Sequence, residues 1–382
     1  MDRSLQFSEG HDIFRNSFRR FLEKEVVPDY PLWEEEGIVP REIWLKFGAN
    51  GYLLPWADEK YGGACADFLY SVIIAEELGR SGASGVLVSL HSDIVAPYVD
   101  SFGSEEQKER WFPRCITGEH ILAVAMTEPE AGSDLASMKT KAVKADGGWL
   151  LNGQKTFISN GILADLIVVA AKTGGAETPA HQAMSLFMVE RGMKGFSRNG
   201  PIKKIGFKAQ DTAELFFDDC FVPDENLIGG EGMGFIYLMK KLQPERLVCA
   251  LASQAAAEQC FEMTVQYVKE RVVFGRPLSR FQNTQFVLAE IASQLAVGRS
   301  FVDDLIRNHM AGKDVVKETC MAKYWICETA KEIADRCLQL FGGYGYCTEY
   351  PISRFYVDAR IQTIYAGTSE IMKLIISRSL GL

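Results

Sequence analysis

The chain has 382 residues, of which 47% are hydrophobic and 24% charged, and its formal net charge is −9. This composition is typical of a globular protein of two or three domains, and the negative charge argues against nucleic acid or an anionic membrane as the main partner. No apolar run approaches the roughly 20 residues of a membrane helix and the start "MDRSLQFSEGHD" lacks a signal-peptide stretch, so we expect a cytoplasmic protein or the mature form of an imported one.

Residues 1–120 are predicted to form an N-terminal helical domain. In "DIFRNSFRRFLEKEVVPDY" the apolar residues recur at helical spacing, and a proline follows them. "PREIWLKFGANGYL" and "DFLYSVIIAEELGRSG" continue the pattern, and each contains a glycine typical of a helix end. In "SEEQKERWF", Ser104 and Gln107 have the spacing of a capping box.

Residues 121–228 have a strand-like pattern. Short runs rich in β-branched and aromatic residues alternate with turn residues. The runs are "ILAVAMTE", "WLLNGQKTFISNG", "ADLIVVAAKT", "AMSLFMVERG" and "TAELFFDDCFVP". Asp146, Gly147 and Gly148 form a predicted hairpin turn. We therefore expect a middle domain built as a small antiparallel β-barrel or sandwich.

Residues 229–382 return to helical spacing, with long segments at 235–271, 280–311 and 314–341 followed by a glycine-rich break and two shorter helices. A C-terminal domain resembling a four-helix bundle is expected. The α–β–α order makes the fold class α+β and differs from the strand–helix alternation of a dinucleotide-binding fold. "IGGEGMGF" is accordingly interpreted as a linker, since Phe235 occupies the third glycine position.

The nine cysteines and five histidines do not indicate a metal or disulfide site. No CxxC pair is present, and the histidines lack ligand spacing, so we predict buried free thiols and no metal. No G-x-S-x-G motif supports a hydrolase.

Glu245 is unusual because the helix that carries it is strongly apolar. In "FIYLMKKLQPERLVCALASQAAAEQ", Leu242, Val248, Cys249 and Ala252 share its face. The carboxylate is either a half-exposed ion-pair partner of Arg246 or a base whose pKa is raised by desolvation. Residue statistics alone favour the ion pair.

Four stretches in this order resemble the acyl-CoA dehydrogenase family along the whole chain. They are "MTEPEAGSD" at 126–134, "NGQKTFISNG" at 152–161, "YVKERVVFGRPL" at 267–278 and "LFGGYGYCTEYPISRFYVDARIQTIYAGTSEI" at 340–371. The resemblance implies bound FAD, a carboxylate that takes the α-proton of an acyl-CoA, and transfer of the β-hydrogen as hydride to flavin N5. It also implies electron transfer to an electron-transferring flavoprotein, a homotetramer built from two dimers, a role in fatty acid β-oxidation, and a cytoplasmic or mature mitochondrial matrix location.

The resemblance assigns one group of residues to the flavin side of the site. Met126 and Thr127 match the strand along the flavin ring, and Ser133 matches a serine near the pyrophosphate; by itself Ser133 would be taken for a turn residue. Phe157 and Ser159 match the aromatic and hydroxyl positions beside the hydride-accepting nitrogen, where the family often has Trp and Thr. A hydroxyl there can stabilise charge on the reduced ring.

A second group is implied to contact the nucleotide part of FAD. The residues that match contacts to the FAD of the neighbouring subunit are Arg271, Phe274 and Gln282, with Gln339, Gly342 and Gly343 at its adenine end. Outside this context Arg271 would be taken for an exposed helix residue. Thr368 and Glu370 match positions near the nucleotide, although the family commonly has glutamine in place of Glu370.

The position of the catalytic base departs from the common family pattern. Many members carry a glutamate directly after the tyrosine equivalent to Tyr365, where this chain has Ala366. Long-chain and isovaleryl members supply the base from a C-terminal-half helix, and the matching residue here is Glu245. In this interpretation the Ala366 N–H binds the thioester carbonyl, and Tyr365 and Gly367 contact the substrate. Arg246 is either a pantetheine or phosphate contact or a structural ion pair.

The whole chain looks closest to long-chain members, but a branched or alicyclic acyl group stays open. Two alternatives to the dehydrogenase are kept: a related oxidase that passes electrons to oxygen, and a catalytically silent acyl-CoA-binding subunit, which Ala366 suggests.

Overall fold

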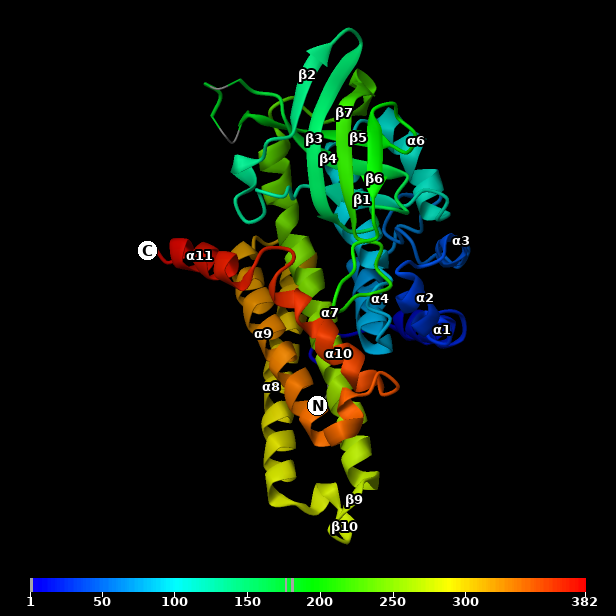
Figure 1. Ribbon diagram of the computed structural model, residues 1–382, viewed down its shortest axis with the longest axis vertical. Coiled ribbons are helices and arrows are strands. Elements are labelled where there is room, and N and C mark those ends of the chain that lie inside the picture. Colours follow the sequence, from blue (N-terminus) through cyan, green and yellow to red (C-terminus); the bar gives the residue numbers. More distant parts are fainter. Residues whose placement is uncertain (1–2, 176, 180–181) are drawn as a thin grey trace.

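Figure 1 shows the computed structural model, which describes residues 3–175, 177–179 and 182–382. The N-terminal part is helical, as predicted. Its helices are α1 (Glu9–Glu25), α2 (Tyr30–Glu36), α3 (Arg41–Ala49), α4 (Phe68–Ser81), a π-helical turn (Leu90–Val95), α5 (Ala96–Phe102) and α6 (Glu105–Ile116). The predicted capping box of Ser104 and Gln107 is present at the start of α6, and Asp67 caps α4. Large aromatic side chains such as Phe18 and Trp44 fill the core between these helices.

The middle part is one open sheet and not a closed barrel, so the barrel form of the predicted antiparallel barrel or sandwich is wrong. Its strands are β1 (Leu122–Ala125), β2 (Lys141–Ala145), β3 (Gly148–Ile158), β4 (Leu166–Lys172), β5 (Met184–Glu190), β6 (Phe196–Asn199), β7 (Ala213–Pro223) and β8 (Leu227–Ile228). The order is β6-β7-β3-β2-β4-β5-β8, and β1 pairs with β4 in parallel. β6 and β8 therefore remain edges, and β2 meets β4 through the single residue pair Lys141–Lys172.

β4 explains how the sheet joins the helices. Leu166, Val168 and Ala170 belong to the core shared with the N-terminal helices, whereas Ile167 and Val169 belong to the core of the sheet. Because both faces of β4 are covered, its sequence is a continuous apolar run and does not alternate between apolar and polar residues.

The C-terminal part is helical again. It contains α7 (Gly234–Glu270), a short hairpin of β9 (Val272–Val273) and β10 (Arg276–Pro277), α8 (Gln282–Met310), α9 (Val316–Phe341), α10 (Pro351–Ala359) and α11 (Ser369–Ser379). The three long helices lie within a few residues of the predicted segments. They run along the long axis of the molecule, with the hairpin at the far end and α11 projecting to one side (Figure 1).

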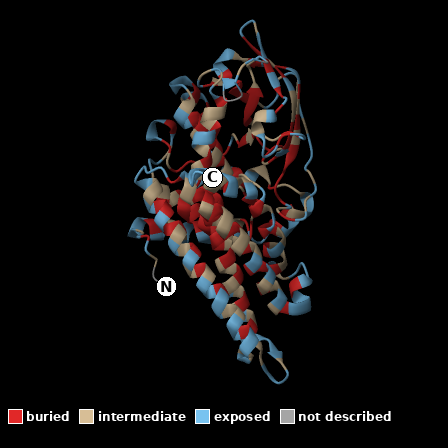
Figure 2. Ribbon diagram, turned by 90° about the vertical axis from the view of Figure 1, so that its left-hand side faces the viewer, coloured by how far each residue is buried: buried red, intermediate tan, exposed pale blue. Residues whose placement is uncertain are grey.

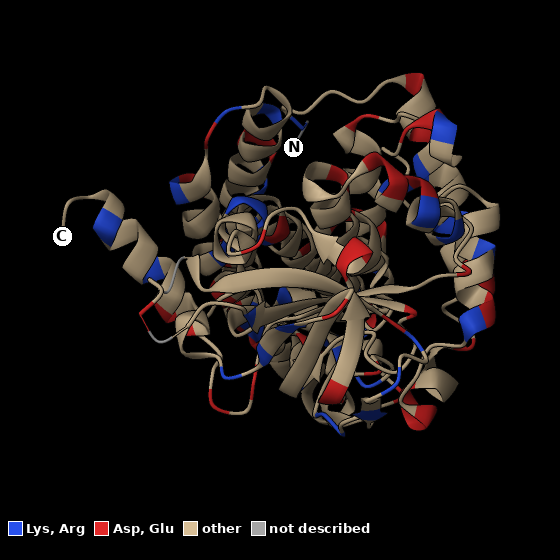
Figure 3. Cartoon of the chain, turned by 90° about the horizontal axis from the view of Figure 1, so that it is seen from above, with Lys and Arg blue, Asp and Glu red and all other residues tan. Residues whose placement is uncertain are grey.

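Burial and charge vary along this arrangement. The long helices are buried where they meet the rest of the molecule and more exposed toward the hairpin (Figure 2). Charged residues lie mainly on the helices and loops around the sheet, whose strands carry few of them (Figure 3). None of the helices in the described ranges is long and apolar enough to cross a membrane.

Candidate active site

Glu245 lies on the buried part of α7 and is only 8% exposed. Its Oε2 has no hydrogen-bond partner among the described residues, and no ion pair there joins it to Arg246. The half-exposed ion-pair interpretation is therefore wrong. Burial raises the pKa of Glu245 to about 7, although the positive charges of Arg246 and Lys323 oppose the rise. A carboxyl group in this state can accept a proton near neutral pH.

The turn that contains Ala366 packs against the same helix. Ala366 and Gly367 both have left-handed backbone conformations, with φ of 54° and 92°. Arg246 of α7 approaches this turn, since its Nη2 lies 3.7 Å from where a Cβ on Gly367 would be. Tyr365 of this segment lies near the Cys249 thiol, one helical turn after Glu245. The fold thus brings together the two segments that the sequence assigns to the base and the substrate carbonyl.

The backbone of this turn has a free donor. The N–H of Ala366 donates no hydrogen bond to another residue in the described part of the chain. A backbone N–H without a partner is available for a ligand oxygen, and this function needs no side chain.

Phe207, which the sequence did not single out, connects the sheet to this turn. Its ring is edge-on to that of Tyr365, with the centroids 6.2 Å apart. Phe207 has φ of 48°, and its N–H donates to Asp358 Oδ1 at 2.6 Å. Ser84, in the turn after α4, donates to the same carboxylate. No sequence signal indicates that Ser84, Phe207 and Asp358 meet, because these residues are far apart in the chain.

The two motifs assigned to the flavin side are hydrogen-bonded to each other. Thr156 N–H donates to the Thr127 carbonyl at 2.9 Å, and the Lys155 ammonium donates to the Met126 carbonyl at 3.1 Å. Lys155 is fully buried and pairs with Glu128 at 2.8 Å. The pair explains why a lysine and a glutamate occur within these motifs, and both residues were missed at the sequence level.

Phe157 follows this pair at the end of β3, with φ of 58° and 66% of its surface exposed. A bulky aromatic residue rarely adopts this conformation, and a large exposed ring beside Met126 and Thr127 fits the face of a planar cofactor such as FAD. Ser159 is half-buried next to it, and Ser133 is exposed in the loop after Thr127. The residues present at this end of β3 therefore fit the isoalloxazine part of FAD.

The residues assigned to a neighbouring subunit's FAD lie at the other end of the molecule. Arg271 immediately precedes the β9–β10 hairpin and Phe274 lies in its turn, and the hairpin is at the end of the molecule opposite the sheet (Figure 1). Phe274 is 96% exposed, and the Arg271 guanidinium lies 5.5 Å from the Tyr344 ring centroid. The other members of this group are Gln282 at the start of α8, Gln339 in the last turn of α9, and Gly342 and Gly343 just after it.

The remaining nucleotide-side residues lie at the start of α11. Thr368 caps that helix, since its side chain accepts a hydrogen bond from Ile371 N–H, and Glu370 is exposed in the first turn.

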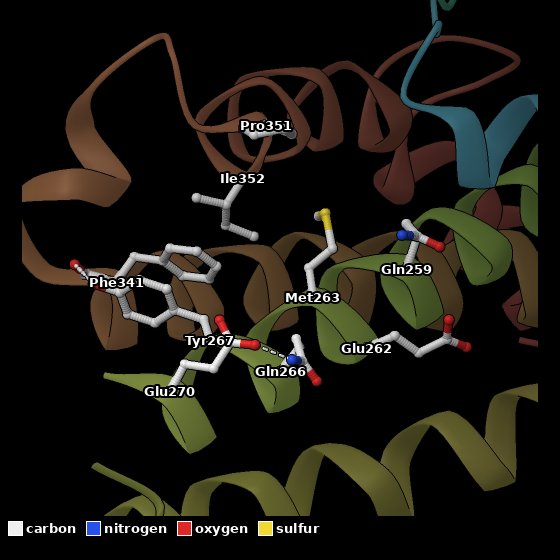
Figure 4. A pocket seen from close by; sticks show the side chains of 9 residues that line it. All are labelled: Gln259, Glu262, Met263, Gln266, Tyr267, Glu270, Phe341, Pro351 and Ile352. Carbon is white, nitrogen blue, oxygen red and sulfur yellow. Dashed lines mark hydrogen bonds between the residues drawn. The ribbon is translucent and has the colours of Figure 1, made fainter. Parts of the chain in front are cut away.

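Two surface cavities lie away from Glu245. The cavity in Figure 4, of about 430 Å³, is lined by the end of α7, by Phe341 and by α10, with the Tyr267 and Phe341 rings stacked 4.1 Å apart. The second, of about 670 Å³, lies between α9, α10 and Ile205. No predicted catalytic, substrate or cofactor residue lines either of them.

Comparisons with known proteins agree with this geometry. Family models described as the acyl-CoA dehydrogenase N-terminal, middle and C-terminal domains match residues 8–119, 123–220 and 232–381. The long-chain specific acyl-CoA dehydrogenase of Sus scrofa is 47% identical over 98% of this chain and 87% of its own length. The isovaleryl-CoA dehydrogenase of Oryza sativa is 37% identical over 99% of this chain and 92% of its own length. The crystal structure of an acyl-CoA dehydrogenase from Geobacillus kaustophilus, 56% identical, superposes over 100% of both chains with a TM-score of 0.98. The chain belongs to the acyl-CoA dehydrogenase family.

Proposed function

We propose that the protein is an FAD-dependent dehydrogenase that converts an acyl-CoA thioester into the trans-2-enoyl-CoA. One observation carries this proposal: Glu245 is buried, its Oε2 and the Ala366 N–H have no hydrogen-bond partner among the described residues, and its helix packs against the turn of Ala366. Glu245 takes the α-proton, and the Ala366 N–H binds the thioester oxygen, where negative charge develops. When bound, FAD supplies the acceptor for the β-hydride.

The fold supports an acyl-CoA site built across three parts of the chain. We take residues 1–120, 121–228 and 229–382 as its domains, a division that the ranges of the three family models support. Met126, Thr127, Ser133, Phe157 and Ser159 hold the flavin and pyrophosphate in this proposal, with Thr368 and Glu370 nearer the nucleotide. Tyr365, Gly367 and Arg246 contact the substrate. A cytoplasmic or matrix location is part of the same proposal.

The activity is expected to rise with pH through about 7. Only ionised Glu245 accepts a proton, and burial raises its pKa to about 7, so kcat/KM should be low in acid and level off above that value. The measurement is the initial rate of flavin reduction across about pH 5.5–9. A rate that stays constant from acid to alkali would contradict the assignment of Glu245.

A second copy of the chain completes the cofactor site in this proposal. Arg271, just before the β9–β10 hairpin, and Phe274, in its turn, are exposed, and the hairpin lies at the opposite end of the molecule from the sheet that contains Phe157 (Figure 1). A homotetramer built as a pair of dimers would bring the tip of one chain to the flavin end of another. Gln282, Gln339, Gly342 and Gly343 would join them there.

Replacing Arg271 by methionine is expected to weaken FAD binding about tenfold or more, because a charge-assisted hydrogen bond to a phosphate is lost. The fold should be unaffected, since the side chain is exposed. FAD affinity is measured by titrating the apoprotein and following flavin fluorescence. Lys269→Met, two residues earlier and also exposed, is the matched control. Equal affinity in Arg271→Met and wild type would argue against a partner site at this tip.

The acyl group is proposed to be long and unbranched, with an electron-transferring flavoprotein as electron acceptor. The higher identity to a long-chain enzyme (47%) than to an isovaleryl enzyme (37%) supports this choice. The test is anaerobic titration with acyl-CoAs from butyryl to palmitoyl and with isovaleryl-CoA, following the visible flavin absorbance. Bleaching by the longer chains is expected. Rapid reoxidation by air in the presence of product would indicate the oxidase, and a protein that binds CoA esters without bleaching would be the silent subunit.

A further inference from the structure

A fully buried lysine lies beside the proposed site. Lys323 is on α9, and its ammonium donates a hydrogen bond to the Gly367 carbonyl at 2.7 Å. No carboxylate in the described ranges forms an ion pair with it. A buried charge is unfavourable unless it is well paired. A buried lysine whose ammonium is hydrogen-bonded to a backbone carbonyl and not to a carboxylate therefore needs an explanation.

The turn that accepts this hydrogen bond is conformationally demanding. Ala366 and Gly367 are consecutive left-handed residues, and a Cβ is disfavoured in that conformation. At Gly367 a Cβ would also lie 2.7 Å from Met372 Cε. The hydrogen bond from Lys323 ties this turn to α9, which in turn packs along α7, the helix of Glu245 (Figure 1).

The charge of Lys323 also acts on Glu245 directly. Burial raises the pKa of that carboxyl, and the positive charges of Arg246 and Lys323 counteract the rise. The other titratable groups that face this buried space are Tyr98 of α5, Cys249 of α7, Cys320 and Cys327 of α9, and Tyr365. Within the part of the chain that the structure describes, Arg246 and Lys323 are the cations that act on Glu245.

We propose that Lys323 is a positioning residue for proton removal: its ammonium holds the Ala366–Gly367 turn so that the Ala366 N–H meets the thioester oxygen, and places a positive charge near Glu245. The positive charge of Lys323 favours the ionised form of Glu245 before proton transfer. The fixed turn keeps the Ala366 N–H in place for the enolate oxygen that develops as the proton leaves. This inference rests on the proposed function and adds a residue to it.

The test compares Lys323→Met and Lys323→Arg with wild type as the FAD-loaded full chain. Lys331→Met is the matched control, because Lys331 lies on the same helix but is half-exposed and forms an ion pair with Glu328. The first readout is kcat and KM with the best acyl-CoA. The second uses a 3-thiaacyl-CoA, in which sulfur replaces the β-carbon, so the α-proton can leave but no hydride can follow. The long-wavelength absorbance of its enolate against the flavin is followed as a function of pH.

For Lys323→Met, kcat is expected to fall about tenfold or more at neutral pH while KM changes little, because the oxyanion contact acts on the transition state. The pH midpoint of the thia-analogue absorbance should move upward, since both the base and the enolate lose a neighbouring cation. Lys323→Arg should recover part of both effects, and Lys331→Met should match wild type.

Wild-type kcat and an unshifted pH midpoint in Lys323→Met would overturn the inference. So would a failure of both Lys323 variants to fold, which would show a purely structural lysine. If the wild-type protein itself never bleaches with any acyl-CoA, the proposed function fails, and the inference falls with it. The wild-type titration therefore separates the two failures.

Discussion

Glu245→Gln is expected to lower turnover by about 10²–10⁴-fold, the usual contribution of a general base, while FAD stays bound. Glutamine has nearly the same shape as glutamate but cannot accept the α-proton. The Oε2 that changes has no hydrogen-bond partner among the described residues, so few contacts are disturbed. The measurement is the rate of anaerobic flavin reduction in a stopped-flow instrument, with the flavin content determined on the same sample.

Glu270→Gln is the control for this substitution, because Glu270 lies on the same helix but is exposed near its end. It should leave turnover and flavin content unchanged. A Glu245→Gln variant that keeps more than about a tenth of wild-type turnover would place the base elsewhere. Loss of turnover together with loss of flavin would show that Glu245 supports the structure rather than the chemistry.

The order of elements could be predicted from the sequence, whereas the closure of the sheet could not. The long helices α7, α8 and α9 are visible because helical spacing and end signals are local. Strand pairing is not local: β1 pairs in parallel with β4 after a connection that contains the β2–β3 hairpin. β6 and β8 have runs of ordinary strand character, and only the three-dimensional arrangement shows that both remain unpaired on one side.

Only part of the site could be predicted, because some of its residues carry a local sequence signal and others are defined by contacts between distant segments. Glu245 was recognisable because a carboxylate on an apolar helix face is unusual, and the same criterion points to Lys323, whose helix neighbours Cys320, Ile326 and Cys327 are all buried. The sequence does not show, however, which carbonyl the ammonium reaches. The contact of Phe207 with Tyr365 and Asp358 joins two distant segments, since Phe207 and Asp358 are 151 residues apart, and neither segment carries a signal for it.

The ion pair of Lys155 and Glu128 stabilises the fold and also holds the flavin-side segment that contains Met126. Lys155→Met is therefore expected to destabilise the protein by about 3–5 kcal/mol. Lys155 is fully buried, and its removal leaves the Glu128 carboxylate buried without a cation. Burial alone would raise the pKa of Glu128, but the hydrogen bond and charge of Lys155 lower it below its usual value, so the carboxylate is ionised in the native protein. The Met126 carbonyl also loses its donor, which should weaken FAD binding.

The free energy of unfolding in urea, measured at one protein and one FAD concentration, checks this expectation. Lys144→Met is the control, because its ion pair with Asp224 is exposed, and such pairs contribute about 0–1 kcal/mol. The double variant Lys155→Met with Glu128→Gln should recover much of the loss, since no buried charge then lacks a partner. A decrease in the free energy of unfolding below about 1 kcal/mol in Lys155→Met would mean that water or a rearrangement compensates the charge of Glu128. The two motifs would then be joined mainly by the Thr156–Thr127 hydrogen bond. The expected large loss would instead show that the ion pair holds the flavin-side segment in place.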